Sequence, residues 1–344
     1  MLKKVKQILC VKEYDAQYVE VGDVDTEKIP DGQVLVKTVI SSVSAGTEKA
    51  NYIGEKHVWG NSDYILPFPR EIGYSSAGVI VGVGNGVDCV NAGDRVVVSR
   101  FKAKHKNYFF ANQEDLIKIP DGVSDKDAAL AFIASFPLGG LRKVKLEIGE
   151  SCLITGLGIL GQFAVKFAKA MGANPVIATD PNPARRKLAL EMGADYAFDP
   201  LDKDAVNNIK AVSGGGVNTA IEVTGVGVGL NQTLDCMKPL GRIALLGCTR
   251  NSDFTVDYYR KVHSPGITLV GAHTNARPRF DSYPNYFTQI DEIDVILKLV
   301  ASKRIVLKDV VSEVHKPTEC TTIYDRLVND KNFPVGLQFD WIDE

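Results

Sequence analysis

One segment limits the possible folds of this chain more than any other: a strand, three glycines and a helix in immediate succession. The apolar run 152–155 leads into Gly156, Gly158 and Gly161, and an amphipathic helix follows. Gly156 allows a tight turn, Gly158 lets the backbone approach a pyrophosphate, and Gly161 lets the helix pack on the strand. The helix N-terminus adds unpaired N–H groups and a positive dipole end that favour phosphate. The segment predicts a dinucleotide-binding βαβ unit.

A second predicted strand supports this interpretation. It covers 175–179 and ends at Asp180, 19 residues after Gly161. A carboxylate at this point accepts hydrogen bonds from the adenosine ribose and repels a 2′-phosphate, so NAD(H) is favoured over NADP(H). The alternative is an ordinary strand–turn–helix with a surface Asp.

Composition narrows the function classes. The chain has 344 residues, enough for two domains, and a formal net charge of -2 at pH 7, which indicates neither nucleic acid nor a membrane surface as partner. Residues 1–10 are expected to form a first strand and not a signal peptide, and no apolar stretch is long enough to span a bilayer. The six cysteines contain no C-x-x-C pair, and Cys152 and Cys248 lie in or beside apolar runs. We therefore expect buried thiols and a cytoplasmic location.

The order of predicted elements indicates two domains. The first 120 residues alternate β-rich runs with turns, as in a partly open β-barrel, and Ser124 is a plausible N-cap where a helical pattern begins. From about residue 150 strands and helices alternate, which predicts a doubly wound parallel sheet. The tail gives one more helix and then β-like sequence that returns to the first domain. The predicted strands are 34–40, 78–83, 95–99, 152–155, 175–179, 218–223, 242–247, 267–271, 309–314 and 334–339, and the predicted helices are 160–171, 183–192, 204–212, 229–238 and one from about 291.

Taken together, these features resemble the medium-chain dehydrogenase/reductase superfamily. The resemblance covers nearly the whole chain, and its marks are the glycine fingerprint together with 84–87, 93–96, 172–173, 222–225 and 239–247. It implies an α/β protein in which a GroES-like β-barrel catalytic domain (1–143 and 274–344) is interrupted by a Rossmann NAD(H)-binding domain (144–273). It also makes a homodimer or a dimer of dimers the expected assembly.

Zinc-dependent members of the superfamily carry ligands that this chain lacks. Their Gly-His-Glu-x-x-Gly motif corresponds to Gly73-Tyr74-Ser75-Ser-Ala-Gly78, and their Cys ligand corresponds to Ala45. The third ligand falls near 131–135, which holds no Cys, His, Asp or Glu, and the four-cysteine lobe of a structural zinc is absent between 100 and 112. A catalytic zinc needs three protein ligands and an open position. We therefore expect no metal, and the chain resembles a zinc-free branch, loosely like bacteriochlorophyllide dehydrogenase-type and sugar-processing members.

The resemblance places candidate catalytic residues where the metal shell would be. Tyr74 could donate a proton or hydrogen-bond to a carbonyl, and Thr47 stands where relatives keep a hydroxyl on the substrate oxygen. Glu48 could orient or deprotonate, and Lys49 could lower the pKa of a neighbouring hydroxyl. The structural alternatives are that Tyr74 fills the volume of the metal, Thr47 caps a turn, and Glu48 pairs with an Arg or Lys.

Further residues are expected to contact substrate or cofactor. His57 and Trp59 border the substrate, His273 follows the last Rossmann strand, and Arg277 lies in an insertion that suits a lid, an anionic substrate or a dimer contact. Arg185 matches a basic residue beside the ribose in NAD-using relatives, while Arg186 keeps NADP(H) use possible. The expected cofactor contacts are Gly156, Gly158, Ile159, Leu160, Gly161, Asp180, Arg185, Thr224, Leu246, Gly247 and Gly271.

Three functional hypotheses remain at this point. The first is a zinc-independent, NAD(H)-dependent oxidoreductase that interconverts a secondary alcohol and a ketone on a sugar, polyol or similar polyhydroxy compound. The second is a quinone/enoyl-type reductase of an activated double bond, although such enzymes prefer NADPH and usually lack an acid like Asp180. The third is a protein that binds a dinucleotide without turnover.

Overall fold

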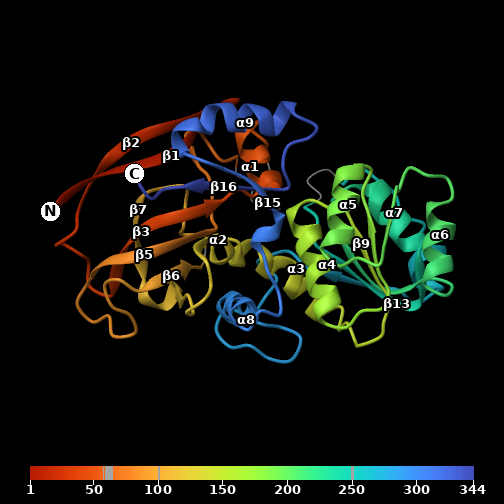
Figure 1. Ribbon diagram of the computed structural model, residues 1–344. Coiled ribbons are helices and arrows are strands. Elements are labelled where there is room, and N and C mark those ends of the chain that lie inside the picture. The colour runs from red at the N-terminus through yellow and green to blue at the C-terminus, as the bar shows by residue number, and fades with distance from the viewer. Residues whose placement is uncertain (57, 59–64, 100, 249–251) are drawn as a thin grey trace. The chain divides into compact units, whose positions relative to one another are not determined.

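The computed structural model describes residues 1–56, 58, 65–99, 101–248 and 252–344, and it divides into two compact units. The first comprises Met1–Ile133 and Gln289–Glu344, and the second comprises Ala134–Thr288. The chain leaves the first unit along α3 (Ala131–Lys143) and returns to it at α8 (Gln289–Ala301) (Figure 1). The sequence placed these boundaries at 143 and 274.

Two β-sheets form the first unit. One is antiparallel with the order β2-β1-β4, and the other has the order β15-β16-β3-β5-β6-β8, with β7 also paired to β3. Along β3 successive side chains alternate between two cores, Val34 and Val36 in one and Leu35 in the other. Each face of β3 is therefore buried in a hydrophobic core. The strands are β1 (Leu2–Lys12), β2 (Asp15–Asp25), β3 (Gln33–Ser42), β4 (Arg70–Glu71), β5 (Ser76–Val83), β6 (Arg95–Val98), β7 (Tyr108–Asn112), β8 (Leu116–Lys118), β15 (Val311–His315) and β16 (Gly336–Asp340).

The tail of the chain is part of this unit, as the sequence predicted. β16 pairs antiparallel with β3, and β15 pairs parallel with β16. Ser124 accepts a hydrogen bond from the Asp127 N–H, which confirms it as an N-cap. Besides α8, the helices of this unit are α1 (Ala45–Tyr52), α2 (Asp125–Ala128) and α9 (Cys320–Asn329), with 3-10 turns at Gln113–Asp115, Lys308–Val310 and Pro317–Glu319.

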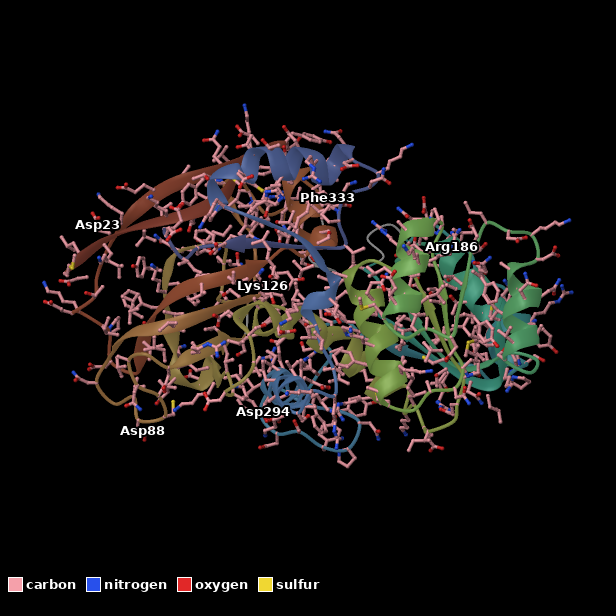
Figure 2. The ribbon with its side chains drawn as sticks, in the orientation of Figure 1. Asp23, Asp88, Lys126, Arg186, Asp294 and Phe333 are labelled. Atoms are coloured by element: carbon pink, nitrogen blue, oxygen red, sulfur yellow. The ribbon has the colours of Figure 1, made fainter. Side chains whose placement is uncertain are left out.

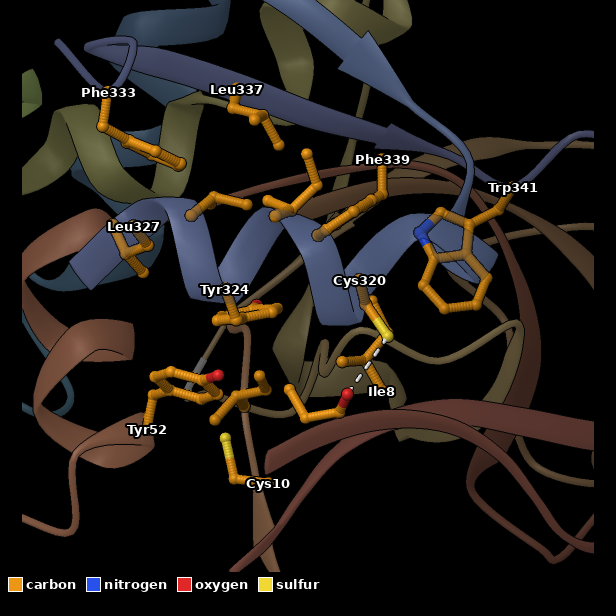
Figure 3. Packing of buried hydrophobic residues seen from close by; sticks show 14 residues of the cluster. Ile8, Cys10, Tyr52, Cys320, Tyr324, Leu327, Phe333, Leu337, Phe339 and Trp341 are labelled. Carbon is orange, nitrogen blue, oxygen red and sulfur yellow. Dashed lines mark hydrogen bonds between the residues drawn. The ribbon is translucent and has the colours of Figure 1, made fainter. Parts of the chain in front are cut away.

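Helix α9 covers one hydrophobic core of the first unit. Its residues Cys320, Ile323, Tyr324 and Leu327 repeat at the spacing of one helical face and are buried. Figure 3 shows them packed against side chains of β1, α1 and the C-terminal segment, including Ile8, Tyr52, Phe339 and Trp341. Trp341, the residue immediately after β16, has no exposed surface. This helix was not predicted.

The second unit contains a six-stranded sheet of the order β11-β10-β9-β12-β13-β14, and every pairing in it is parallel. This is the strand order of a Rossmann sheet, so the predicted doubly wound fold is confirmed. Helix α4 contacts β9 and β10, and α7 contacts β9 and β12 (Figure 1). The elements are β9 (Cys152–Thr155), α4 (Ile159–Ala170), β10 (Val176–Thr179), α5 (Pro183–Glu191), β11 (Tyr196–Phe198), α6 (Ala205–Val212), β12 (Val217–Glu222), α7 (Gly227–Asp235), β13 (Met237–Leu245), a π-helical turn (Tyr259–His263) and β14 (Thr268–Gly271).

Two predictions for this unit were wrong in detail. The helix expected over 229–238 ends at Asp235, because β13 begins at Met237 and is irregular before Arg242, with Leu240 at a φ of 64°. Cys248 is exposed, because it follows the buried part of β13, whereas Cys152 is buried as expected. Within the described residues, no helix is long and apolar enough to cross a membrane.

Candidate functional site

The glycine fingerprint has the geometry that the sequence predicted. Gly156 has a φ of 92°, which favours glycine, and a Cβ on Gly161 would lie 1.9 Å from the carbonyl oxygen of Gly156. A Cβ on Gly158 would meet no atom within 4 Å, so this side of the loop is open. Gly158 is also the N-cap of α4 and has no side chain to cap it. The loop therefore presents backbone N–H groups to open space, which suits a phosphate.

Asp180 is fixed beside this loop. Its Oδ2 accepts the N–H of Leu157 at 2.8 Å, and its Oδ1 accepts the N–H of Asn182 at 2.8 Å. An ionised carboxylate has about four acceptor positions, so both oxygens can still accept from a ribose. Arg185 Nη1 lies 3.8 Å from Oδ2.

Arg186 has other partners. Its Nη1 donates to the carbonyl oxygens of Asp180 and Pro181, at 2.7 and 2.9 Å, and pairs with Asp199 at 3.1 Å. Figure 2 labels this side chain in the second unit. These contacts commit the guanidinium to the protein, which weakens the case for Arg186 as a partner of a 2′-phosphate.

A buried carboxylate organises the carboxyl end of β12. Glu222 accepts the N–H and hydroxyl of Thr224 and the N–H of Gly225, and burial raises its pKa. A Cβ on Gly247 would lie 2.3 Å from the Gly225 nitrogen, so the chain segments after β12 and β13 can meet only at a glycine. Thr224 and Gly247 thus lie at the sheet edge where ligands of open α/β sheets bind. Leu246 is buried, and Gly271 ends β14 at the same edge.

The loop after β14 is held by a lysine that the sequence did not single out. Lys143 Nζ donates to the carbonyl oxygens of Gly271, at 3.0 Å, and Ala276. Burial and, to a smaller extent, the charge of Arg277 lower the pKa of Lys143 to about 8. Burial also lowers the pKa of His273, and the charges of Lys143 and Arg277 act in the same direction. His273 therefore accepts the Asn275 N–H as a neutral ring, in a region of positive potential.

In the first unit, aromatic rings pack where a metal shell would lie in zinc-dependent proteins. The Tyr74 ring lies 5.1 Å from Phe101 and 5.4 Å from Phe132, and those two rings are 5.0 Å apart. Ala45 has no ligating atom, and nowhere in the described ranges do three His, Cys, Asp or Glu side chains form a group that could hold a metal. The residues at these positions do not fit a zinc ion.

The hydroxyl of Tyr74 has a defined partner. It donates to Ser44 Oγ at 2.5 Å, and both side chains are buried. Ser44 immediately precedes α1, which carries Thr47, Glu48 and Lys49. The predicted candidates Tyr74 and Glu48 are therefore brought to the same helix terminus.

Glu48 is 1 % exposed and lies at the centre of a hydrogen-bond network. Its Oε1 accepts the Ser44 N–H at 2.8 Å, and its Oε2 contacts His105 Nε2 at 3.1 Å and accepts the Tyr324 hydroxyl. Burial opposes ionisation, but the His105 charge and these hydrogen bonds together lower the pKa of Glu48. The carboxylate is thus ionised and occupied, which favours an orienting role over deprotonation of a substrate. Among the residues that the structure describes, its side-chain partners are His105 and Tyr324, whereas the structural alternative expected an Arg or Lys.

His105 extends the network to the C-terminus. Its Nδ1 lies 2.7 Å from Ser41 Oγ, which also accepts Trp341 Nε1–H at 2.8 Å. Ser44, His105 and Tyr324 were missed by sequence reasoning. The N-cap position of Ser44 was a usable signal, whereas no local pattern marks His105 or Tyr324.

The other candidate residues are less buried or make fewer side-chain contacts. Thr47 and Lys49 are half-buried, and neither side chain has a hydrogen-bond partner in the part of the chain that the structure describes. Arg277 is half-buried and His263 is exposed. His57 and Trp59 lie outside the described residues.

Comparison with known proteins gives two family matches. Residues 30–143 match the alcohol dehydrogenase GroES-like domain, and residues 160–292 match the family described as zinc-binding dehydrogenase. The L-threonine 3-dehydrogenase of Thermococcus kodakarensis is 33% identical over 301 residues, which cover 78% of this chain and 83% of that protein. The sorbitol dehydrogenase of Bacillus subtilis is 28% identical over 266 residues, or 68% of this chain and 74% of that protein.

Solved structures share the fold over the whole chain. A protein of Sinorhizobium meliloti 1021, described as a zinc-binding dehydrogenase and bound to NADP, has a TM-score of 0.80 at 18% identity and covers 98% of this chain and 99% of its own. An alcohol dehydrogenase of Escherichia coli CFT073, complexed with NADH, has a TM-score of 0.80 at 17% identity with coverage of 98% and 99%.

Proposed function

Because this chain belongs to the zinc-type alcohol dehydrogenase-like medium-chain dehydrogenase/reductase superfamily, we propose that it interconverts a secondary alcohol and a ketone with NAD(H) and without zinc. Its relatives make it an alcohol/ketone oxidoreductase with a nicotinamide cofactor, built from a GroES-like unit and a Rossmann unit. The proposal adds the absence of zinc, the choice of NAD(H) and the substrate class.

The observation that carries the zinc-free proposal is the chemistry at positions 45 and 74. Alanine offers no ligand, and Tyr74 is enclosed by Phe101 and Phe132 and bonded to Ser44. Without a Lewis acid, the charge on a reacting oxygen must be handled by hydroxyl groups. Tyr74 is proposed as the proton donor and Thr47 as a hydrogen-bond donor to the substrate oxygen.

The roles of the remaining residues follow from their positions. A bound nicotinamide would give or accept the hydride, and the fingerprint loop and Asp180 would hold its pyrophosphate and ribose. Asp180 supports NAD(H) over NADP(H) because it would face a 2′-phosphate with like charge. Glu48 orients the start of α1, and Lys49 would raise the local positive potential. Polar groups in each unit support a sugar, polyol or other polyhydroxy substrate, the class to which sorbitol belongs. They are the half-buried Lys49 in the first unit, and the half-buried Arg277 and exposed His273 in the second.

Three measurements test the proposal. Elemental analysis of protein purified without chelator is expected to give no stoichiometric zinc, and NADH is expected to raise Tm more than NADPH at equal concentration. NAD⁺ reduction is expected with polyols or glycosides, and NADH oxidation with quinones or enones would instead indicate a double-bond reductase. Tyr74→Phe is expected to lower kcat about 100-fold or more while leaving nucleotide affinity unchanged. Full activity of Tyr74→Phe, or stoichiometric zinc needed for turnover, would overturn the proposal.

We further propose a homodimer, or a dimer of two such dimers, in the cytoplasm. β14 is the edge strand of the parallel sheet, with Leu269 exposed, so it can pair with a second copy. Light scattering after size exclusion measures the mass, and a monomer at micromolar concentration would contradict this assembly.

A further inference from the structure

Ser44 is at the N-cap of α1 but does not cap the helix. Serine at this position usually accepts an N–H of the first turn. Here the Ser44 side chain makes no such bond, and its Oγ instead accepts the hydroxyl of Tyr74 at 2.5 Å. The N-terminus of α1 therefore lacks a common stabilising hydrogen bond, and the hydroxyl groups of Ser44 and Tyr74 contact each other.

The backbone of Ser44 is held by Glu48 in two ways. Glu48 Oε1 accepts the Ser44 N–H at 2.8 Å, and the Glu48 N–H donates to the Ser44 carbonyl at 2.9 Å. His105 and Tyr324 in turn fix the other oxygen of this carboxylate. The serine hydroxyl is therefore carried on a backbone that cannot shift without breaking a buried ionic network.

His105 also holds the segment that carries Tyr74. Its backbone N–H donates to the Ile72 carbonyl at 3.0 Å. A Cβ on Gly73 would lie 2.6 Å from two ring carbons of His105, so the backbone before Tyr74 lies directly on this ring. Both partners of the Tyr74–Ser44 hydrogen bond are thus positioned by His105 and Glu48.

We propose that Ser44 is the positioning residue for proton transfer by Tyr74, with Glu48 and His105 fixing the pair. This inference rests on the proposed function. In ketone reduction a bound nicotinamide would supply the hydride for the carbonyl carbon. The O–H bond of Tyr74 breaks, and its proton goes to the substrate oxygen. The Ser44 hydroxyl then turns from acceptor to donor and stabilises the phenolate until solvent returns the proton. Alcohol oxidation follows the reverse course and releases the proton to solvent.

The kinetics of two Ser44 variants distinguish an effect of losing the hydroxyl group from an effect of changing the N-cap residue of α1. Ser44→Ala is expected to lower kcat about 10- to 100-fold at unchanged KM for the nucleotide. Ser44→Gly is expected to lose as much, although glycine is a good N-cap residue, because it also lacks the hydroxyl. The double variant Ser44→Ala/Tyr74→Phe is expected to be no slower than Tyr74→Phe, since the two residues act as one unit.

Ser42→Ala is the matched control. Ser42 is another buried serine of the same segment, and its Oγ accepts Gln338 Nε2 at 3.0 Å. Its kcat is expected to remain within about twofold of wild type. If Ser42→Ala lowered kcat as much as Ser44→Ala, the effect would not be specific to the hydroxyl that contacts Tyr74. That result would overturn the inference.

A spectroscopic test does not depend on turnover. In protein labelled with ¹³Cζ-tyrosine, the signal missing from Tyr74→Phe identifies Tyr74. Ser44→Ala is expected to move this signal, whereas Ser42→Ala should leave it in place. An unmoved signal, an unchanged kcat of Ser44→Ala, or losses that multiply in the double variant would each overturn the inference while leaving the proposed function intact. A fully active Tyr74→Phe would instead remove the proton donor, and the inference with it.

Discussion

At the scale of single residues, Gly73 shows how closely the site is packed. Its φ is 81°, and a Cβ would lie 2.6 Å from the His105 ring and 2.7 Å from the His105 backbone nitrogen. The ring cannot move aside, because Glu48 and Ser41 hold its two nitrogens. A side chain at this position therefore meets both backbone strain and a fixed neighbour.

We predict that Gly73→Ala lowers the free energy of unfolding by about 3 kcal/mol or more, from overpacking and left-handed strain together. Gly122 is the matched control, because its φ is also 81° but a Cβ there meets no atom within 4 Å. Gly122→Ala is expected to cost only the strain, about 1 kcal/mol. Urea unfolding measures both, and equal losses would show that contact with His105 has no effect.

At the scale of elements, the turn from β9 into α4 contains two glycines with different expected roles. Gly161 is needed for packing, and Gly158 is expected to face the nucleotide. We predict that Gly161→Ala lowers the Tm of the ligand-free protein, because its Cβ would lie 1.9 Å from the Gly156 oxygen. Gly158→Ala is expected to keep Tm within a few degrees but to weaken NADH binding about tenfold or more, since its Cβ enters open space meant for phosphate. Calorimetric titration and thermal unfolding distinguish the two. Normal NADH affinity in a folded Gly158→Ala would contradict this assignment.

Helix α9 is tied to β15 by an ion pair. Both terminal nitrogens of Arg326 bond the two oxygens of Glu313, at 2.9 and 3.0 Å, and with His315 they lower the pKa of Glu313 to about 2 against burial. Because the folded-state pKa lies below the unfolded value, the pair stabilises the protein above about pH 4.5, and this stabilisation is lost as the pH falls toward 2.

We predict that Glu313→Gln lowers the free energy of unfolding by about 1 kcal/mol at pH 6, after allowance for solvent screening. Its stability is expected to depend less on pH than that of wild type between about pH 5 and 3. Denaturant unfolding across this range measures both effects. Parallel pH profiles for the two proteins would exclude a contribution from this pair.

The sequence predicted elements best where the signal was local. β9 was predicted with its observed bounds, because an apolar run ends at the fingerprint glycine. Helix α1 was missed because Ala45–Tyr52 has no apolar stripe and is held by the buried Glu48. The motif comparison led to Tyr74, Thr47 and Glu48, but His105 and Tyr324 are 57 and 276 residues from Glu48 along the chain. Only the folded structure could bring them together.

At the scale of the whole chain, the last residues complete the core that supports the catalytic candidates. Trp341 is fully buried in the cluster around α9, and its Nε1–H donates to Ser41, which contacts His105. The network around Glu48 therefore uses residues from both chain segments of the first unit.

We predict that Trp341→Ala destabilises the first unit by about 3–5 kcal/mol, from the cavity and the lost hydrogen bond. Ile342→Ala is the control, because this neighbouring side chain is 57% exposed, and its effect is expected within about 0.5 kcal/mol. Guanidinium unfolding followed by circular dichroism measures both. A tolerated Trp341→Ala would mean that the C-terminal segment does not support the network.

Asp180 has a consequence for attempts to change the nucleotide that the protein accepts. Its two oxygens already receive N–H groups from the fingerprint loop and from the start of α5, so the carboxylate is ordered before any nucleotide arrives. Replacing it with a small neutral residue would remove a repulsive charge and would also strip two main-chain donors of their acceptor. Cofactor engineering at this position must therefore redesign the loop along with the side chain.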